Sequence, residues 1–415
     1  MFISWFRITP LVRSIALILI AMSLLASGAK AEGKKSQPED VISAEVQAQN
    51  SKDWDSLPKH WITHERASLE SFFANDDNRL ALRGYFNMQS AKLIGIQEIP
   101  MKDAGLFVDI SSYQKQYQGV RLFYTAIEYS ITQEDKFHFN GTNYRLMVVV
   151  QEDGEWRLAE MSEAPVEAIL AIGKGFSSNG EADAIKVRKA RAKGEIINPR
   201  GKQLGKNAAD INEERQRRGN NPVPPDAMAA TASTPVPPSM ILVRMTKNTN
   251  LVWYGCNREC IIGVNFTTYI RNVLPNEWSD SNFPFESLKA GAMAVKHFGW
   301  FRVLNPKYPG QGFDAYDDTR DQTYIAGTAK TWANSAIDAV AGIGMYRTNS
   351  RDIFQSQYVR GNCICDGGKS TGVVQQLGSW YQARDKGMNY VNILRYYYDY
   401  ATDNLAGQTL SLFVY

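Results

Sequence analysis

One long interruption in the apolar pattern constrains this sequence more than any other feature. Between residues 173 and 240 the regular spacing of apolar residues disappears, glycine, asparagine, alanine and charge dominate, and proline-rich runs occupy 222–225 and 235–238. Such composition is typical of a linker that is extended where prolines cluster. The 415 residues are also many for one hydrophobic core. We therefore predict two folded domains, at 50–172 and 241–415, joined by a disordered linker at 173–240.

The first 31 residues have the pattern of an export signal. Arg7 and Arg13 precede an apolar stretch from Ile15 to Leu25, and small residues follow up to Ala31. This order predicts a secretory signal peptide at 1–31. The alternative is a retained membrane anchor, although the apolar run is shorter than the ~20 residues of a spanning helix. We expect an exported, extracytoplasmic protein, secreted or associated with the wall or the membrane surface.

Four cysteines occur as two close pairs, Cys256 with Cys260 and Cys363 with Cys365. Disulfides persist outside the cytoplasm, so all four are disulfide candidates, with the pairing left open. A four-thiolate zinc site is the alternative, but the spacing is unusual for one. We predict no metal.

The formal net charge of +3 is unevenly distributed. Residues 181–218 hold eleven Lys or Arg against six Asp or Glu, so the predicted linker is basic. Nucleic acid is an unexpected partner for an exported protein. The basic segment either contacts anionic wall polymer or lipid headgroups, or is a solvated spacer.

The first domain has helical spacing before strand patterns. Apolar spacing is helical from Trp61 to Tyr85, whereas the lead at 32–50 is polar and predicted to be disordered. The strands are predicted at 91–99, 120–132, 144–150 and 156–161, the last two joined by a hairpin turn at Asp153-Gly154. With Tyr85-Phe86-Asn87 and the run from Asn143 to Met147, residues 55–170 resemble the cone-shaped fold of nuclear transport factor 2-like and SnoaL-like domains, a helix-plus-curved-sheet fold.

We assign the first domain no catalysis. His60 and His64 lie one helical turn apart, but no third metal ligand is evident. Tyr124, Glu128 and Tyr129 could line a pocket, yet alternating aromatics on a strand more often pack in a core. A further hypothesis makes this domain the functional half, binding a small molecule or a partner, with the C-terminal part as a wall anchor.

The second domain begins with a predicted strand at 241–245. A short helix at 267–273 is expected to stop at Pro275. A longer helix from Pro284 to Phe298 carries small residues at 290, 291, 292 and 294, so we expect it to be buried against neighbours.

Five segments of this domain share a pattern with one known family. They are Leu274 to Trp278, Asp318 to Tyr324, Asn334 to Met345, Gln375 to Ser379 and Tyr390 to Tyr398. In this order they resemble the SpoIID/LytB family, named for the stage II sporulation protein D and a modifier of a wall amidase. The resemblance covers about residues 241–400 and implies an α+β domain that acts on bacterial peptidoglycan.

Glu277 stands where the family places the proposed catalytic residue of a lytic transglycosylase. Ordinary glycoside hydrolysis uses two carboxyl groups. A lytic transglycosylase can work with one, because the 6-hydroxyl of the sugar replaces water and closes an anhydro ring on muramic acid. Glu277 would protonate the glycosidic oxygen and then accept the hydroxyl proton, which requires a protonated carboxyl group that burial beside Trp278 could favour. The alternative is a helix-capping or solvent-facing carboxylate. No cofactor is required.

Four more residues fall on polar positions of the family. Lys296, Gln322, Tyr324 and Gln376 are therefore candidate substrate-binding residues. The alternatives are a surface lysine for Lys296 and satisfied polar groups of a core or loop for the other three.

Two departures from the family matter. Arg320 and Asp321 stand where some relatives carry metal ligands, and Ser370 to Val373 lacks the histidine of a His-Gly-x-Gly turn. The main hypothesis is a transglycosylase acting on peptidoglycan strands, including strands stripped of peptide stems. The lost histidine favours the alternative, a non-catalytic glycan-binding protein that recruits or enhances a cell-wall amidase.

Overall fold

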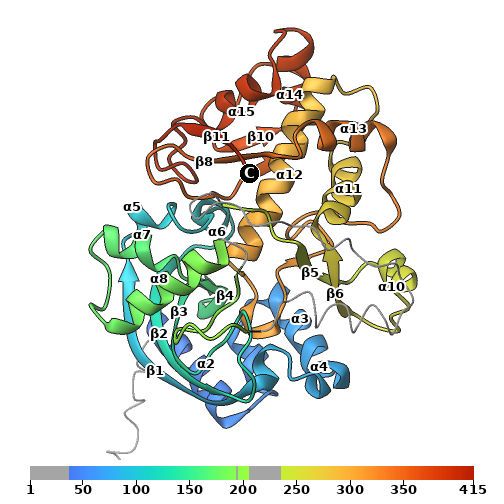
Figure 1. The fold of residues 1–415 in the computed structure, drawn as a ribbon. Coiled ribbons are helices and arrows are strands. Elements are labelled where there is room, and N and C mark those ends of the chain that lie inside the picture. Colours follow the sequence, from blue (N-terminus) through green and yellow to red (C-terminus); the bar gives the residue numbers. More distant parts are fainter. Residues whose placement is uncertain (1–36, 193–194, 205–234) are drawn as a thin grey trace, which may run out of the picture. The chain divides into compact units, whose positions relative to one another are not determined.

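The structure combines helices with several separate sheets, and the fold is α+β as predicted. This computed structural model describes residues 37–192, 195–204 and 235–415 (Figure 1). The predicted export signal and residues 205–234 of the predicted linker lie outside them. Residues 38–415 form one compact unit. Within it, residues 38–204 (the N-terminal half) and 235–415 (the C-terminal half) have different sheets and different hydrophobic clusters.

A four-stranded antiparallel sheet with the order β1-β2-β3-β4 forms the centre of the N-terminal half. Its strands are β1 (Met88–Ile99), β2 (Val120–Ile131), β3 (Gly141–Glu152) and β4 (Glu155–Glu163). All four predicted strands are therefore present. The predicted hairpin is confirmed as well, because Asp153 and Gly154 both have the positive φ that a tight two-residue hairpin turn requires.

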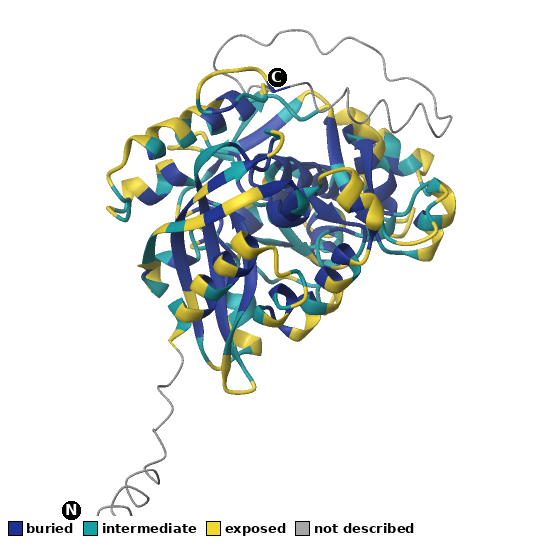
Figure 2. Cartoon of the chain, turned by 90° about the horizontal axis from the view of Figure 1, so that it is seen from below, coloured by how far each residue is buried: buried dark blue, intermediate teal, exposed yellow. Residues whose placement is uncertain are grey.

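Both faces of this sheet are covered by helices. These helices are α2 (Pro38–Ser51), η2 (Leu57–His60), α3 (Thr63–Phe73), α4 (Asp76–Leu80), η3 (Gly84–Asn87), α5 (Met101–Ala104), α6 (Ile110–Gln116), α7 (Val166–Ala171) and α8 (Asn179–Ala192). Neighbouring residues of a strand point to opposite faces. Phe123 accordingly packs with α2 and α3, whereas Leu122 and Tyr124 belong to the cluster under α5 to α8. The strands are largely buried, while the helices expose one side (Figure 2).

Helix α2 corrects the prediction that residues 32–50 are disordered. Val41, Ile42 and Val46 of α2 are buried against the sheet. The sequence pattern does not indicate this helix because its buried face also holds Glu45, a residue type that usually faces solvent. Glu45 is fully buried and lies 3.2 Å from both the His60 Nδ1 and the Tyr85 hydroxyl.

Helix α8 corrects part of the predicted linker. Residues 179–192 are helical and pack beside α7 and β3, although their composition is polar. Their charged residues have specific partners: Glu181 accepts hydrogen bonds from the Tyr124 hydroxyl at 2.9 Å and the Phe176 N–H at 2.8 Å, and Arg191 pairs with Glu163 at 2.7 Å. Polar composition therefore did not mean solvent exposure here.

Three small sheets support the C-terminal half. The first has the order β6-β5-β7, and the other two pair β8 with β11 and β9 with β10. Their strands are β5 (Met240–Met245), β6 (Cys260–Asn265), β7 (Ala315–Tyr316), β8 (Ile343–Arg347), β9 (Gln357–Val359), β10 (Val373–Gln375) and β11 (Leu410–Val414). The predicted strand at 241–245 is thus confirmed as β5.

A long central helix, α12, organises the helices of the C-terminal half. These helices are α10 (Asn248–Tyr254), α11 (Phe266–Glu277), α12 (Phe285–Leu304), η4 (Pro309–Gln311), α13 (Thr331–Ala339), α14 (Gln376–Arg384) and α15 (Tyr390–Tyr398). Helix α12 contacts α11, α13, α14 and α15 (Figure 1). Its small residues, including Ala290, Gly291 and Ala292, are buried as predicted. In the described residues, no helix has the length and apolarity needed to span a membrane.

Helix α11 runs further than predicted. The sequence places its end before Pro275, but the helix continues to Glu277 with Pro275 inside it. A proline in the last turn costs one backbone hydrogen bond. The Trp278 N–H still bonds to the Leu274 carbonyl at 2.8 Å, so the turn closes despite the proline. Glu277 is consequently the last residue of a helix rather than part of a loop.

Buried polar contacts join the two halves. Lys136, between β2 and β3, places its ammonium group 2.6 Å from an Asp314 oxygen, and both side chains are almost fully buried. Arg191 of α8 donates to the Leu304 carbonyl at the end of α12, and Arg244 of β5 donates to the Ser68 carbonyl of α3 at 2.8 Å. Charged groups with paired partners therefore hold this contact.

Breaking the buried Lys136–Asp314 pair should strongly destabilise the protein. Replacing Lys136 by Met leaves a buried carboxylate without its cation, which typically costs about 3 kcal/mol or more. We expect urea unfolding to show a loss of that size. Lys189→Met removes an exposed pair with Glu167 and should cost below about 1 kcal/mol. Equal losses for the two variants would contradict this prediction.

Candidate functional site

The carboxyl group of Glu277 sits where two separate segments meet. Its Oε1 accepts a hydrogen bond from the Thr323 backbone N–H at 2.8 Å, and its Oε2 accepts one from the Gln376 amide at 3.3 Å. Helix α11 is positioned by Asn265, whose side chain accepts from the Thr268 N–H and caps the helix start. The structure thus brings Glu277 and Gln376, predicted from distant motifs, into direct contact.

Gln322 occupies the centre of a buried polar network beside Glu277. Its Oε1 accepts from the Tyr269 hydroxyl at 3.0 Å, and its Nε2 donates to the Tyr358 hydroxyl at 2.9 Å and the Val295 carbonyl at 3.2 Å. Burial raises the pKa of Tyr358 well above its usual range, and the negative charge of Glu277 adds to this rise. The hydrogen-bonding groups of Gln322 are therefore engaged within the protein.

Tyr324 is also part of the interior. Its ring is stacked on Tyr269 with centroids 5.4 Å apart, and its hydroxyl lies 2.6 Å from that of Tyr254. Only about 1% of Tyr324 is exposed. The structure thus places Gln322 and Tyr324 in the interior with their polar groups paired within the protein, and their role in substrate binding stays a prediction.

Trp278 fixes the end of α11 against α12. Its ring is fully buried, packs against Tyr358, and donates from Nε1 to the Ser379 hydroxyl at 3.3 Å. A Cβ built on Gly291 would lie 2.7 Å from the Trp278 ring. The glycine therefore allows the close approach that places Glu277 beside Gln376.

Lys296 does not join the other predicted residues. Its ammonium group donates to the Val340 carbonyl at 2.7 Å and the Ile343 carbonyl at 2.5 Å, and lies over the Tyr415 ring. Gln322 bonds to the backbone carbonyl of the preceding residue, Val295, whereas the Lys296 ammonium group lies beside the end of α13 and the start of β8. Burial lowers the pKa of Lys296 to about 7. The structure therefore places Lys296 apart from the other predicted residues, and its role in substrate binding stays a prediction.

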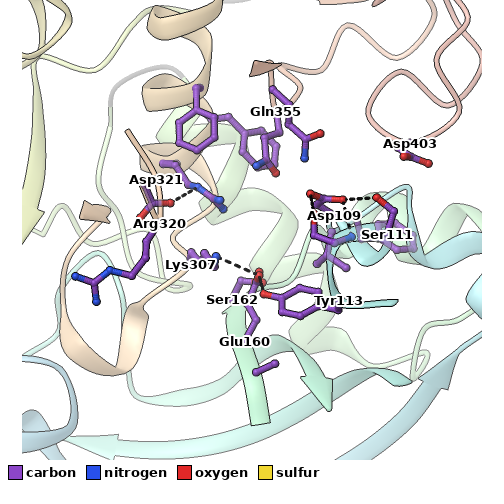
Figure 3. Close-up of a pocket in the computed structure, with 18 of the residues that line it drawn as sticks. Asp109, Ser111, Tyr113, Glu160, Ser162, Lys307, Arg320, Asp321, Gln355 and Asp403 are labelled. Atoms are coloured by element: carbon purple, nitrogen blue, oxygen red, sulfur yellow. Dashed lines mark hydrogen bonds and ion pairs between the residues drawn. The ribbon is translucent and has the colours of Figure 1, made fainter. Parts of the chain in front are cut away.

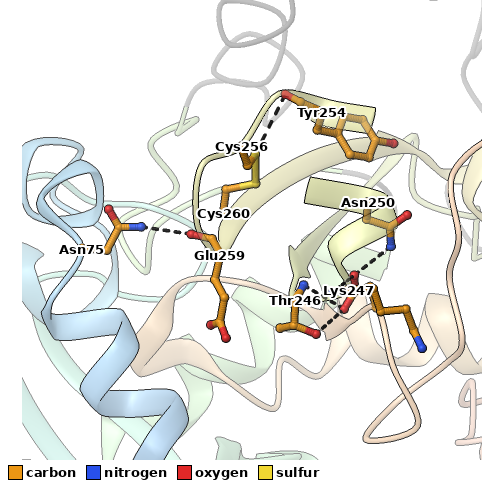
Figure 4. The surroundings of a disulfide bond; sticks show 9 residues. Asn75, Thr246, Lys247, Asn250, Tyr254, Cys256, Glu259 and Cys260 are labelled. Carbon is orange, nitrogen blue, oxygen red and sulfur yellow. Dashed lines mark hydrogen bonds between the residues drawn. A yellow bond between two sulfur atoms is a disulfide. The ribbon is translucent and has the colours of Figure 1, made fainter. Parts of the chain in front are cut away.

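Both cysteine pairs form disulfides. Cys256–Cys260 links the end of α10 to the start of β6, next to Glu259, whose backbone carbonyl accepts from the Asn75 amide (Figure 4). Cys363–Cys365 closes a short turn before β10. The four sulfur atoms are thus used in two local bonds rather than in one zinc site. Across the described ranges, no group of three or more potential ligands is arranged to hold a metal ion.

A cleft of about 820 Å³ lies between residues of both halves (Figure 3). Its polar floor includes two ion pairs, Arg302 with Asp321 at 3.2 Å and Lys307 with Glu160 at 3.6 Å. Glu65 also lines the cleft, and burial raises its pKa although Lys307 and Arg320 oppose the rise. Arg320 and Asp321 are thus cleft residues.

Glu277 does not line this cleft, but its neighbours do. Gln375 lines the cleft directly before Gln376, and Tyr358 lines it while bonding to Gln322. The cleft lining is therefore adjacent in the sequence to a residue that bonds to Glu277. Sequence reasoning missed the cleft because its charged residues come from segments more than 200 positions apart, so they form no local motif.

Comparison with known proteins adds no relative. No protein-family model matches the sequence, and no curated protein matches it.

The contact between Gly291 and Trp278 can be tested by adding one methyl group. Gly291→Ala should destabilise the protein by about 1–3 kcal/mol, because the new Cβ overlaps the indole ring. Urea unfolding measures the change. Gly367→Ala adds the same group where no atom lies within 4 Å, and should have little effect. A loss no larger for Gly291→Ala than for Gly367→Ala would show that α12 and Trp278 can shift apart easily.

The buried Lys296 should make stability depend on pH. Its folded-state pKa of about 7 lies below the ordinary value of about 10.4, so between these values the unfolded chain binds a proton that the folded protein lacks. The unfolding free energy should therefore rise with pH across this window, by up to about 1.4 kcal/mol per unit. Urea unfolding at about pH 7 and about pH 9 measures this rise in unfolding free energy. The rise should be smaller for Lys296→Met than for the parent protein, whereas the exposed Lys330→Met should show the same rise as the parent. Identical slopes in all three proteins would refute this assignment.

Proposed function

We propose that this protein is exported and acts on peptidoglycan glycan strands as a lytic transglycosylase, with Glu277 as its single acid and base. The observation that carries the proposal is the position of the Glu277 carboxyl group. Thr323 and Gln376, from two of the segments that resemble the SpoIID/LytB family, both donate hydrogen bonds to it. A carboxyl group held by distant segments in one geometry suits a catalytic role better than a capping role.

The reaction needs only this one carboxyl group. Glu277 would give its proton to the glycosidic oxygen as the bond from that oxygen to the muramic acid C1 breaks. The 6-hydroxyl of the same sugar then bonds to C1, and its proton passes to Glu277. This exchange restores the carboxylic acid and leaves an anhydro-muramic end. The proposed reaction uses no metal and no cofactor.

Residues that bond around Glu277 are connected to residues that line the cleft. Gln376 follows a cleft residue, and the Gln322–Tyr358 hydrogen bond connects the Glu277 surroundings to the cleft wall. A glycan strand in the cleft would lie against Tyr358 and Gln375.

A second function is favoured by a specific observation. Gln322 and Tyr324 bond within the protein, and Lys296 is buried elsewhere, so three of the predicted substrate-binding residues are not free to hold sugar. These contacts weaken the case for catalysis at Glu277. The histidine missing from Ser370 to Val373 favours the second function, a non-catalytic protein that enhances or recruits a cell-wall amidase and that would hold the glycan through other residues.

Digestion of purified glycan strands, with and without peptide stems, separates the two functions. We expect the whole protein to release anhydro-muramic ends, detected by mass spectrometry. Glu277→Gln should slow this release by roughly 100-fold or more, the usual effect of losing general acid–base catalysis. Glu286→Gln is a matched control, since this carboxylate of α12 binds the Tyr390 N–H away from the site.

The opposite outcomes are equally informative. Intact strands after incubation with the parent protein, together with retained binding to them, would overturn the transglycosylase and leave the amidase enhancer. Addition of a cell-wall amidase would then reveal whether the protein stimulates it. Undiminished release by Glu277→Gln would assign the acid and base to another residue.

A further inference from the structure

Four glutamine side chains line the cleft without a hydrogen-bond partner in the described part of the chain. They are Gln116 at the end of α6, Gln355 before β9, Gln357 in β9 and Gln375 in β10. Figure 3 shows the amide of Gln355 pointing into the cleft. Gln355, Gln357 and Gln375 are partly buried, whereas Gln116 is exposed. Each amide carries two donors and an acceptor, so the four together offer a ligand with many polar groups a set of hydrogen-bond partners.

Aromatic rings accompany these amides. Phe107 and Tyr117 line the cleft from the N-terminal half, and Phe298, Phe301 and Tyr358 line it from the C-terminal half. A ring offers a flat apolar face, onto which the apolar face of a sugar ring can pack. Amides that pair with hydroxyl groups, next to rings that stack on sugar faces, form a surface suited to carbohydrate.

The charges of the cleft do not favour a strongly acidic ligand. Four basic and six acidic side chains line the cleft, so it offers no positive excess to an acidic ligand. The Arg302–Asp321 and Lys307–Glu160 pairs also neutralise each other within the protein. Amide side chains are self-complementary with acetamido groups, because each provides both an N–H donor and a C=O acceptor.

We propose that this cleft binds an oligosaccharide that carries acetamido groups, and that the N-terminal half forms one wall of the binding site. Its volume of about 820 Å³ lies in the range of about 300–1,000 Å³ that ligand sites occupy. The inference rests on the proposed function in taking a glycan as the ligand, but it does not require Glu277 to be catalytic. It assigns the N-terminal half a role in recognition.

The test is calorimetric titration of the whole protein with the N-acetylglucosamine tetramer. The glucose tetramer, which lacks acetamido groups, is the matched ligand and should bind at least several-fold more weakly. Gln116→Ala and Gln357→Ala should each weaken binding of the acetylated tetramer by roughly three- to tenfold, the loss of one neutral hydrogen bond. Gln114→Ala changes the same residue type on α6 outside the cleft and should bind like the parent.

Several outcomes would overturn the inference. Absence of binding, equal binding of both tetramers, or the same affinity for Gln116→Ala, Gln357→Ala and Gln114→Ala would each do so. A loss confined to Gln357→Ala would remove the N-terminal half from the site. Running the titration with Glu277→Gln as well separates the two proposals. If Glu277→Gln no longer cleaves strands but still binds the acetylated tetramer, the cleft proposal is supported. If the glutamine variants cleave strands like the parent, the cleft proposal is rejected and the catalytic role of Glu277 is unaffected.

Discussion

Helix α12 is buried over nearly its whole length, and the rest of the C-terminal half is arranged around that burial. A 20-residue helix with neighbours on all sides needs small residues where they approach and partners for its polar groups. Gly291 accommodates Trp278, and the Val295 carbonyl accepts from Gln322. Near its end, Arg302 faces Asp321 at the cleft. The same helix therefore supports both the surroundings of Glu277 and the cleft floor.

The two sites on this frame differ in character. Around Glu277 the polar groups are closely paired and most of them are hidden, as a fixed arrangement for chemistry requires. The cleft instead presents free amides and aromatic rings on an open surface. Gln375, which lines the cleft, directly precedes Gln376, which bonds to Glu277. In the proposed reaction the glycan would reach the partly exposed Glu277 carboxyl group directly, and the cleft would hold a neighbouring part of the same strand.

Sequence patterns predicted the parts of this fold that depend on local spacing. The four strands and the Asp153-Gly154 turn follow from alternation and turn chemistry, and the buried helix follows from its small residues. The patterns failed for α2 and α8, because Glu45 and Glu181 are charged but buried through specific partners. Glu277 and Gln376, singled out from separate motifs, lie in contact, whereas Lys296 lies apart from them. Motif position alone does not determine which way a side chain leaves a helix. The cleft required the tertiary structure, because it joins residues that are distant in the sequence.

The disulfides close very short loops, with sequence separations of four and two residues. A disulfide that closes a short loop removes little conformational entropy from the unfolded chain. These two bonds therefore fix local turns more than they stabilise the whole fold. Their nearness has a second consequence, for biogenesis. Each cysteine meets its own partner as soon as a few more residues have emerged, before the other pair is present to compete. A protein exported in the unfolded state could thus be oxidised in order along the chain, with little need for disulfide reshuffling.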